Sequence, residues 1–192
     1  MALMQDNQQI AKHILENVGG QPKVIKYRDA NEASAIDIFM AENKPQLGVT
    51  TCATIGLSES SIGLVLGTGK ELRTEFIGVY GNNFTKFPNI VSSCAFNIMN
   101  DNFLCRPGTV YPNVIDEYYK DTEMKHVLLT SPFLWENLTN IETESKVITW
   151  LLLIPISESE LEYLNDNGSD ALESLFEEEQ IDIFDINRKS ML

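Results

Sequence analysis

An almost unbroken apolar run late in the chain restricts the folds that are open to it. Residues 147–156 read VITWLLLIPI, and Thr149 and Pro155 are the only interruptions. The run lacks the alternation of a half-exposed strand, so it predicts a strand over 146–156 that is buried on both faces. It is too short to span a bilayer, which needs about 20 residues. A capping-box pattern, Ser157-x-x-Glu160, follows at once and predicts a helix over 157–164.

The first half of the chain is rich in short segments that favour β-structure. Their Val, Ile, Thr and aromatic residues are typical of strands. The predicted strands of this half are 23–27, 35–40, 47–57, 62–66 and 71–80. Later in the chain we expect a strand at 127–130, a loop at 105–112, and an edge strand at 181–186, where apolar and acidic residues alternate. Short strands at this spacing indicate a mixed or antiparallel sheet.

Helical periodicity predicts three further helices. They cover residues 4–18, 88–100 and 169–179, and the first is followed by a Gly-Gly stop. The class predicted by these elements is α+β: a single domain whose mixed or antiparallel sheet has flanking helices, with a βαβ unit around the central helix as an option. We expect an N-terminal helix within residues 1–20 to pack on a domain formed by 21–192.

The balance of charge excludes several classes of partner. The 192 residues include 28 Asp and Glu against 14 Lys and Arg, and the formal net charge is −14. Proteins that bind nucleic acid need cations to replace the counterions of phosphate, and anionic membranes also attract cations. We therefore expect no direct nucleic-acid partner and no membrane partner, whereas a basic protein would be attracted.

The acidic excess is concentrated near the C-terminus. Residues 147–187 contain eleven carboxylates and neither Lys nor Arg. This region could be a solvated helix surface, a docking surface for a basic partner, or a metal site. Its spacing does not resemble a calcium-binding loop, so we expect no metal and no cofactor.

Motifs for catalysis are incomplete. Residues 67–70 (GTGK) lack both the earlier glycine and the following Ser or Thr of a phosphate-binding loop. Residues 56–60 (GLSES) lack the second glycine of a nucleophile elbow. We expect His13 on a helix surface and His126 at the start of a strand, neither of them catalytic. The sequence therefore predicts no enzyme.

Cysteine usage and the N-terminus indicate a compartment. Cys52, Cys94 and Cys105 are an odd set without the paired spacing of a metal site. Three buried thiols in a reducing environment fit this pattern best. Residues 1–6 lack the basic and apolar regions of a signal peptide. We therefore expect a cytoplasmic protein.

The segment from Trp150 to Leu161 also resembles a known family. Its buried strand, proline stop and capped helix closely resemble the late strand-to-helix signature of the Suppressor of fused (SUFU) domain family. Other segments resemble family motifs in the same order: 35–39 (AIDIF), 50–58 (TTCATIGLS), 73–77 (RTEFI), 107–108 (PG), 168–176 (GSDALESLF) and 185–190 (DINRKS). The resemblance covers about residues 27–190, and Cys52 and Lys189 depart from the usual family residues.

The resemblance implies a SUFU-like domain that binds rather than catalyses. Animal members of the family sequester a transcription factor by holding an extended peptide. Stand-alone bacterial members are similar to immunity proteins, or antitoxins, that neutralise polymorphic toxins. A short acidic chain looks most like the second group, which implies a cognate secreted LXG-type toxin with a C-terminal nuclease domain. Since a nuclease must be basic to hold phosphate, an acidic binder would associate with it quickly.

Two modes of binding remain open. Contact with a basic nuclease domain would use carboxylates near the C-terminus. The candidates are Glu173, Glu177, Glu178, Glu179, Asp182 and Asp185. The first two are four residues apart and share a helix face. The alternative is a general peptide- or protein-binding scaffold that sequesters a regulatory partner by adding its strand to a sheet edge. The sequence has no signal for an oligomeric state.

Overall fold

The computed structural model describes residues 2–192, with side-chain surroundings from Asp6 onward. Its strands are β1 (Lys23–Arg28), β2 (Ala35–Glu42), β3 (Val49–Ile55), β4 (Leu64–Val65), β5 (Glu71–Gly81), β6 (Val110–Tyr111), β7 (Met124–Thr130), β8 (Ile141–Glu142) and β9 (Lys146–Ser157). Its helices are α1 (Ala2–Val18), α2 (Phe87–Asp101), α3 (Glu158–Asn167) and α4 (Ser169–Glu179), with a short 3₁₀ turn at Leu57–Glu59.

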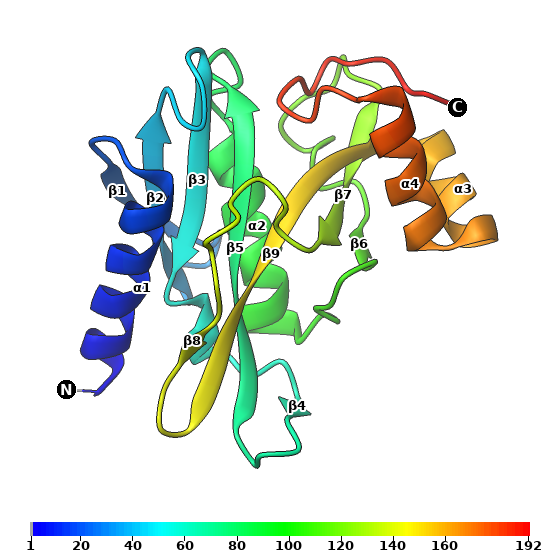
Figure 1. Ribbon diagram of the computed structural model, residues 1–192. Coiled ribbons are helices and arrows are strands. Elements are labelled where there is room, and N and C mark those ends of the chain that lie inside the picture. Colours follow the sequence, from blue (N-terminus) through cyan, green and yellow to red (C-terminus); the bar gives the residue numbers. More distant parts are fainter. Residues whose placement is uncertain (1) are drawn as a thin grey trace.

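One mixed sheet crosses the molecule (Figure 1). The strand order is β1-β2-β3-β5-β9-β7-β6, and β4 and β8 add short pairings to β5 and β9. Neighbours are antiparallel except for β5 and β9, where residues 71–78 pair in parallel with residues 146–153. The predicted α+β class and the mixed sheet are confirmed.

The βαβ element expected as an option around the central helix is present only with a long insertion. β5 and β9 are parallel neighbours, and α2 does follow β5. However, β6, β7 and β8 lie between α2 and β9 in the sequence, and β7 pairs antiparallel with the far half of β9. The connection between the parallel strands β5 and β9 therefore contains three strands in addition to α2.

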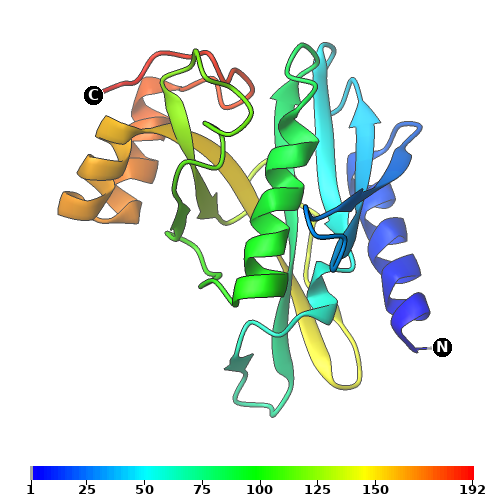
Figure 2. The same ribbon diagram turned by 180° about the vertical axis from the view of Figure 1, so that it is seen from behind.

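Helices cover both faces of the sheet. On one face lies α2 (Figure 2), where Ile90 and Ile98 are fully buried. On the other face, α1 and α4 contribute Ile14 and Leu172 to a second core cluster. Between these layers β9 is buried on both faces from Trp150 onward, as its apolar run predicts.

The capping box that starts α3 is present in full. The Glu160 N–H donates to Ser157 Oγ (3.2 Å), and the Ser157 N–H donates to Glu160 Oε2 (3.0 Å). Both bonds satisfy helix N-terminal donors that would otherwise have no partner. The helix continues through Asn167, beyond the predicted end at 164, and stops at Gly168, whose φ is +90°.

The edge strand predicted at 181–186 is wrong. These residues form two successive turns, in which the Asp185 N–H donates to the Asp182 carbonyl and the Arg188 N–H to the Asp185 carbonyl. Each aspartate also accepts from a backbone N–H two residues on, at 2.9 Å from Phe184 and 2.8 Å from Asn187. Such side-chain bonds compete with strand pairing, and the alternation of apolar and acidic residues does not reveal them.

Candidate docking site

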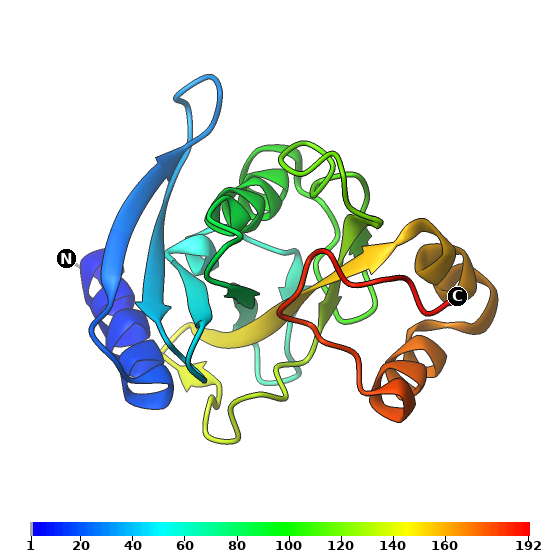
Figure 3. The ribbon, with the colours of Figure 1, turned by 90° about the horizontal axis from the view of Figure 1, so that it is seen from above.

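The chain after α4 forms a strap across one end of the sheet. Residues 180–192 leave α4, cross over β9 and return toward α3 (Figure 3). The Gly81 N–H at the end of β5 donates to the Phe184 carbonyl (2.8 Å), and Thr122 Oγ1 donates to the Ile186 carbonyl. The strap is therefore bonded to the sheet, although none of its residues is part of it.

A buried ion pair holds the end of this strap. Arg188 Nη1 lies 2.6 Å from Glu160 Oε1, and Nη2 lies 2.7 Å from Oε2. Glu160 is fully buried and Arg188 is 8% exposed. The guanidinium also donates to the Pro155 carbonyl (3.0 Å) and lies 5.5 Å from the ring centroid of Phe176 on α4. Glu160 is thus a structural residue, and one of the eleven C-terminal carboxylates is removed from the surface.

The strap, α4 and the loop after β7 enclose a groove of about 500 Å³, which we call the acidic groove. Its apolar lining is Phe133, Leu134, Ile154, Phe176, Ile181, Ile183 and Phe184. Its polar lining is Gln46, Glu173, Glu177, Gln180 and Asp182. The groove therefore combines an apolar floor with carboxylates from α4 and from the strap.

Three of the six predicted contact residues line this groove. Glu173 and Glu177 lie one turn apart on α4, as their spacing predicts, and Asp182 lies on the strap. Glu178 and Glu179 are exposed at the end of α4 but are not part of the lining. The carboxylate of Asp185 accepts a bond within its own turn.

The residues that line the groove include three carboxylates and neither Lys nor Arg. From residue 126 to 187 the sequence holds fourteen carboxylates and a single cation, Lys146, which pairs with Asp6 at 2.8 Å. Across the described part of the chain, no Lys or Arg forms an ion pair with Glu173, Glu177 or Asp182. The lining of the groove therefore carries a local negative charge.

Sequence reasoning missed the residues on the other side of the groove. Phe133 follows Pro132 in the loop after β7 and is 58% exposed, and Gln46 belongs to the loop between β2 and β3. Neither position has helical or strand periodicity, so no pattern connects them with α4. Only the tertiary fold brings these loops together.

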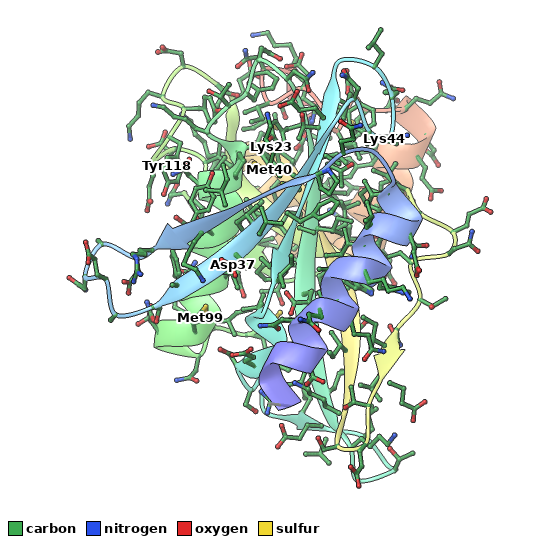
Figure 4. The ribbon with its side chains drawn as sticks, turned by 90° about the vertical axis from the view of Figure 1, so that its left-hand side faces the viewer. Lys23, Asp37, Met40, Lys44, Met99 and Tyr118 are labelled. Carbon is green, nitrogen blue, oxygen red and sulfur yellow. The ribbon has the colours of Figure 1, made fainter. Side chains whose placement is uncertain are left out.

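Strand β1 forms one edge of the sheet and is rich in basic residues. β1 ends the strand order and carries Lys23, Lys26 and Arg28. Figure 4 faces this edge, where Lys23 lies beside its register partner Met40. Lys26 pairs with Asp37 at 2.9 Å. Lys23 likewise pairs with Glu42 at 2.9 Å, so both lysines of this strand are held by carboxylates of β2.

The groups that most resemble catalytic residues have structural partners. His126 is buried; its Nδ1 accepts from the Asn113 N–H (2.9 Å), and its Nε2 lies 3.0 Å from Glu158 Oε2. His13 is not simply on the helix surface, because it is partly buried, stacks on Trp150 and bonds to a backbone carbonyl. The imidazoles therefore join segments of the fold.

All three cysteines are buried and free, as predicted. Burial raises the pKa of the Cys105 thiol to about 12, and it also raises the pKa of Cys52 and of Cys94. The thiolate, which is the reactive form, is therefore strongly disfavoured at neutral pH.

Buried Glu75 shapes the turn that ends β3. Its carboxylate accepts from Thr54 Oγ1 (2.5 Å) and from the backbone N–H groups of Gly56, Leu57 and Ser58 (3.0 to 3.2 Å). The pKa of this carboxyl is raised by burial, and the hydrogen bonds from Thr54 and Ser58 oppose that shift. The group serves the fold rather than an open site.

Membrane-spanning helices and metal-binding clusters are both absent from the described residues. No helix there is long and apolar enough to cross a membrane. No cluster of three or more His, Cys, Asp or Glu within that part of the chain could hold a metal ion.

Comparisons with known proteins agree on one family. A model described as Suppressor of fused protein (SUFU) matches residues 32–189. The chain is 45% identical to the immunity protein YqcF of Bacillus subtilis (strain 168) over 193 residues, which cover 100% of both proteins.

Solved structures share the fold. A putative SUFU homologue from Neisseria gonorrhoeae FA 1090 has a TM-score of 0.73 at 18% identity, covering 98% of each chain. Drosophila Suppressor of Fused has a TM-score of 0.66 at 12% identity, covering 96% of this chain and 51% of that one. The structure of a Sufu–Fu complex has a TM-score of 0.64 at 12% identity, covering 96% of this chain and 91% of that one.

Proposed function

The chain belongs to the Suppressor of fused protein (SUFU) family, and from this membership we propose that it is an immunity protein that binds and neutralises a cognate toxin. The observation that carries the proposal is the full-length identity of 45% to the immunity protein YqcF. Because the alignment covers both proteins in full, the similarity extends over the whole fold and not over one part of it.

We extend the proposal to the class of toxin. The partner would be the C-terminal nuclease domain of a secreted LXG-type toxin, and binding would protect the producing cell from within its cytoplasm. The chemical support is charge, because a nuclease must present cations to phosphate. The acidic region between residues 126 and 187 complements such a surface, and opposite charges would speed association.

The proposed contact surface is formed by the six carboxylates predicted from the sequence. Glu173, Glu177 and Asp182 would meet the toxin in the acidic groove, while Glu178, Glu179 and Asp185 would attract it from the surrounding surface. Inhibition would need no chemistry from this chain. We accordingly propose a binding protein with no enzymatic activity and no cofactor.

Binding to the toxin tests the proposal directly. The probe is the C-terminal domain of the toxin encoded beside this gene, and its affinity is measured at two salt concentrations. Nanomolar affinity that falls steeply with salt is the expected result, together with rescue of growth when the two proteins are made in the same cell. Absence of binding and of rescue would overturn the proposal for that toxin.

A second experiment distinguishes direct contact at the groove carboxylates from attraction by the net charge of the whole protein. Reversal of two groove carboxylates, Glu173→Lys with Glu177→Lys, should slow association and reduce its dependence on salt. A matched control reverses Glu32 and Asp101, which are exposed outside the acidic region and give the same change of net charge. Equal effects of the two pairs would exclude the groove carboxylates as a local docking surface.

A second candidate function uses the free end of the strand order. β1 is the last strand at its side of the sheet, so an extended peptide could add to it and be sequestered there. Val24 and Ile25 are exposed on this strand, whereas Lys23 and Lys26 are already paired with Glu42 and Asp37, so charge would matter little to the peptide. Backbone hydrogen bonds would carry the affinity, so such a complex would persist in about 1 M salt, where screening acts within about 3 Å.

A further inference from the structure

We propose that the acidic groove is an anchor site that receives one large apolar side chain of the toxin, flanked on the toxin by Lys or Arg. This inference rests on the proposed function and deepens it, because it specifies which chemistry of the partner is recognised. It also predicts that affinity depends on the apolar floor as well as on the carboxylates.

The floor of the groove is suited to an apolar side chain. Ile154 and Phe176 are buried beneath it, and the partly exposed Ile181 and Phe184 form its walls. The volume of about 500 Å³ falls within the range of about 300–1,000 Å³ found for pockets that hold drug-sized ligands. It therefore has room for a bulky side chain together with the adjoining backbone.

Phe133 gives the groove an aromatic rim. More than half of its side chain, 58%, is exposed, although the ring lines the groove. A partner that covers this ring removes apolar surface from water, which stabilises a complex. Large side chains that enter well-packed pockets carry most of the energy of many protein interfaces. Phe133 is therefore placed to pack against such an anchor.

The charges at the rim decide between possible occupants. Glu173 and Glu177 on α4 and Asp182 on the strap surround the apolar floor, without a Lys or Arg partner in the described part of the chain. An acidic or phosphate-bearing ligand would meet like charge. A second copy that used the same groove would do so too. Lys or Arg beside the anchor would pair with the rim and lay its methylene groups on the aromatic rings.

The groove is held in shape before a partner arrives. One wall is fixed by the bond from the Gly81 N–H to the Phe184 carbonyl, at 2.8 Å. The other end of the strap is held by the buried pair of Arg188 and Glu160, next to Phe176. Because the groove residues are already held in place, binding costs less conformational entropy, and the affinity is correspondingly higher.

The test compares Phe133→Ala with a matched control. Val65→Ala removes an exposed apolar side chain (67% exposed) from β4, at the far end of the sheet from α4 (Figure 1). Both positions are exposed, so both variants should fold, which thermal unfolding checks. For binding to the toxin's C-terminal domain, F133A should raise Kd at least tenfold, mainly through faster dissociation, whereas V65A should leave Kd unchanged.

A second measurement identifies the occupant. A photo-crosslinking amino acid placed at position 133 should capture a toxin segment with a large apolar residue flanked by Lys or Arg, and one placed at position 65 should not. Equal Kd values for F133A and V65A, or capture of a segment without basic residues, would overturn the anchor site while leaving the immunity role intact. If the native protein does not bind the toxin, both proposals fail.

Discussion

The carboxylate of Glu160, at the start of α3, accepts two hydrogen bonds from the guanidinium of Arg188, near the end of the chain. Residues 28 positions apart are thereby joined inside the molecule. The pair connects the strap to the helix that follows the central strand, so the same contact supports the fold and one wall of the acidic groove.

Removal of one partner of this pair should be costly. Arg188→Met leaves a buried carboxylate without its cation, so we expect a loss of about 3–5 kcal/mol in the free energy of unfolding, measured with urea. Lys189→Met is the control, because the neighbouring pair with Glu123 is exposed and its loss should barely move the midpoint. The double variant Glu160→Gln with Arg188→Met should recover part of the loss. If the Arg188 variant is as stable as the Lys189 variant, the buried pair does not stabilise the fold.

Buried Glu75 should make stability depend on pH with a definite sign. Burial raises the pKa of its carboxyl above the ordinary value of 4.5. Between the ordinary and the raised pKa, the folded state therefore holds more protons than the unfolded state, and stability falls as pH rises through this window.

The native protein compared with Glu75→Gln isolates this effect. As pH rises from about 4.5, the free energy of unfolding of the native protein should fall relative to that of the variant. The difference should become constant once Glu75 is ionised in the folded state. Partly exposed carboxyls such as Asp116, whose pKa is lowered mainly by its hydrogen bond from Lys125, act in the opposite direction but cancel in the difference. A difference that is constant with pH would refute the prediction.

Gly78 allows α2 to approach the sheet closely. A Cβ at this position would lie 2.8 Å from Cε1 of Phe87, the first residue of α2. Gly78→Ala should therefore displace the ring and lower the free energy of unfolding by about 1–3 kcal/mol. Gly67→Ala, which adds its methyl group to open space, should change it by about 0.5 kcal/mol or less. Similar effects at the two positions would show that the sheet and the helix readily move apart.

The end of α4 carries charge that opposes its own dipole. Glu177, Glu178 and Glu179 occupy its last turn, which has no basic residue. Glu179→Lys should therefore raise the free energy of unfolding by about 0.3–1 kcal/mol at low salt. Asp170→Lys, in the first turn, is the control and should lower it, because the sign of the dipole is reversed there. If both substitutions shift stability in the same direction, the dipole does not control it.

The predicted division into an N-terminal helix and a domain over 21–192 is also testable. Ile14 on α1 is fully buried, so Ile14→Ala should cost about 2–5 kcal/mol if α1 unfolds with the rest. Tryptophan fluorescence, to which Trp150 stacked on His13 of α1 contributes, and far-UV circular dichroism should then report a single midpoint. Two separated transitions would show that α1 is an independent unit.

Elements with a strong local pattern could be predicted from the sequence. The apolar run of β9, the capping box at Ser157 and the periodicity of α2 can each be recognised within a short stretch of sequence. The strap and the two-residue strands β6 and β8 could not be predicted. Their conformation depends on bonds to distant segments, such as that from Gly81 to Phe184.

The candidate site was predictable only in part. The position of Glu173 and Glu177 on one helix face follows from their spacing, and both line the groove. Phe133 and Ile154 lie opposite them through tertiary packing that no local pattern encodes. The capping box identifies the local role of Glu160, but no pattern reveals that Glu160 is buried against Arg188 while Glu173 faces the groove.

The pairing at the centre of the sheet also constrains how the protein is made. β5 has to find β9, and the segment between Gly81 and Lys146 separates them along the chain. Contacts between such distant residues form slowly, because a large loop must close first. During translation, β5 and β9 therefore cannot pair until most of the chain has left the ribosome. A nascent chain interrupted before β9 would expose the apolar face of β5 and become a substrate for chaperones or proteases.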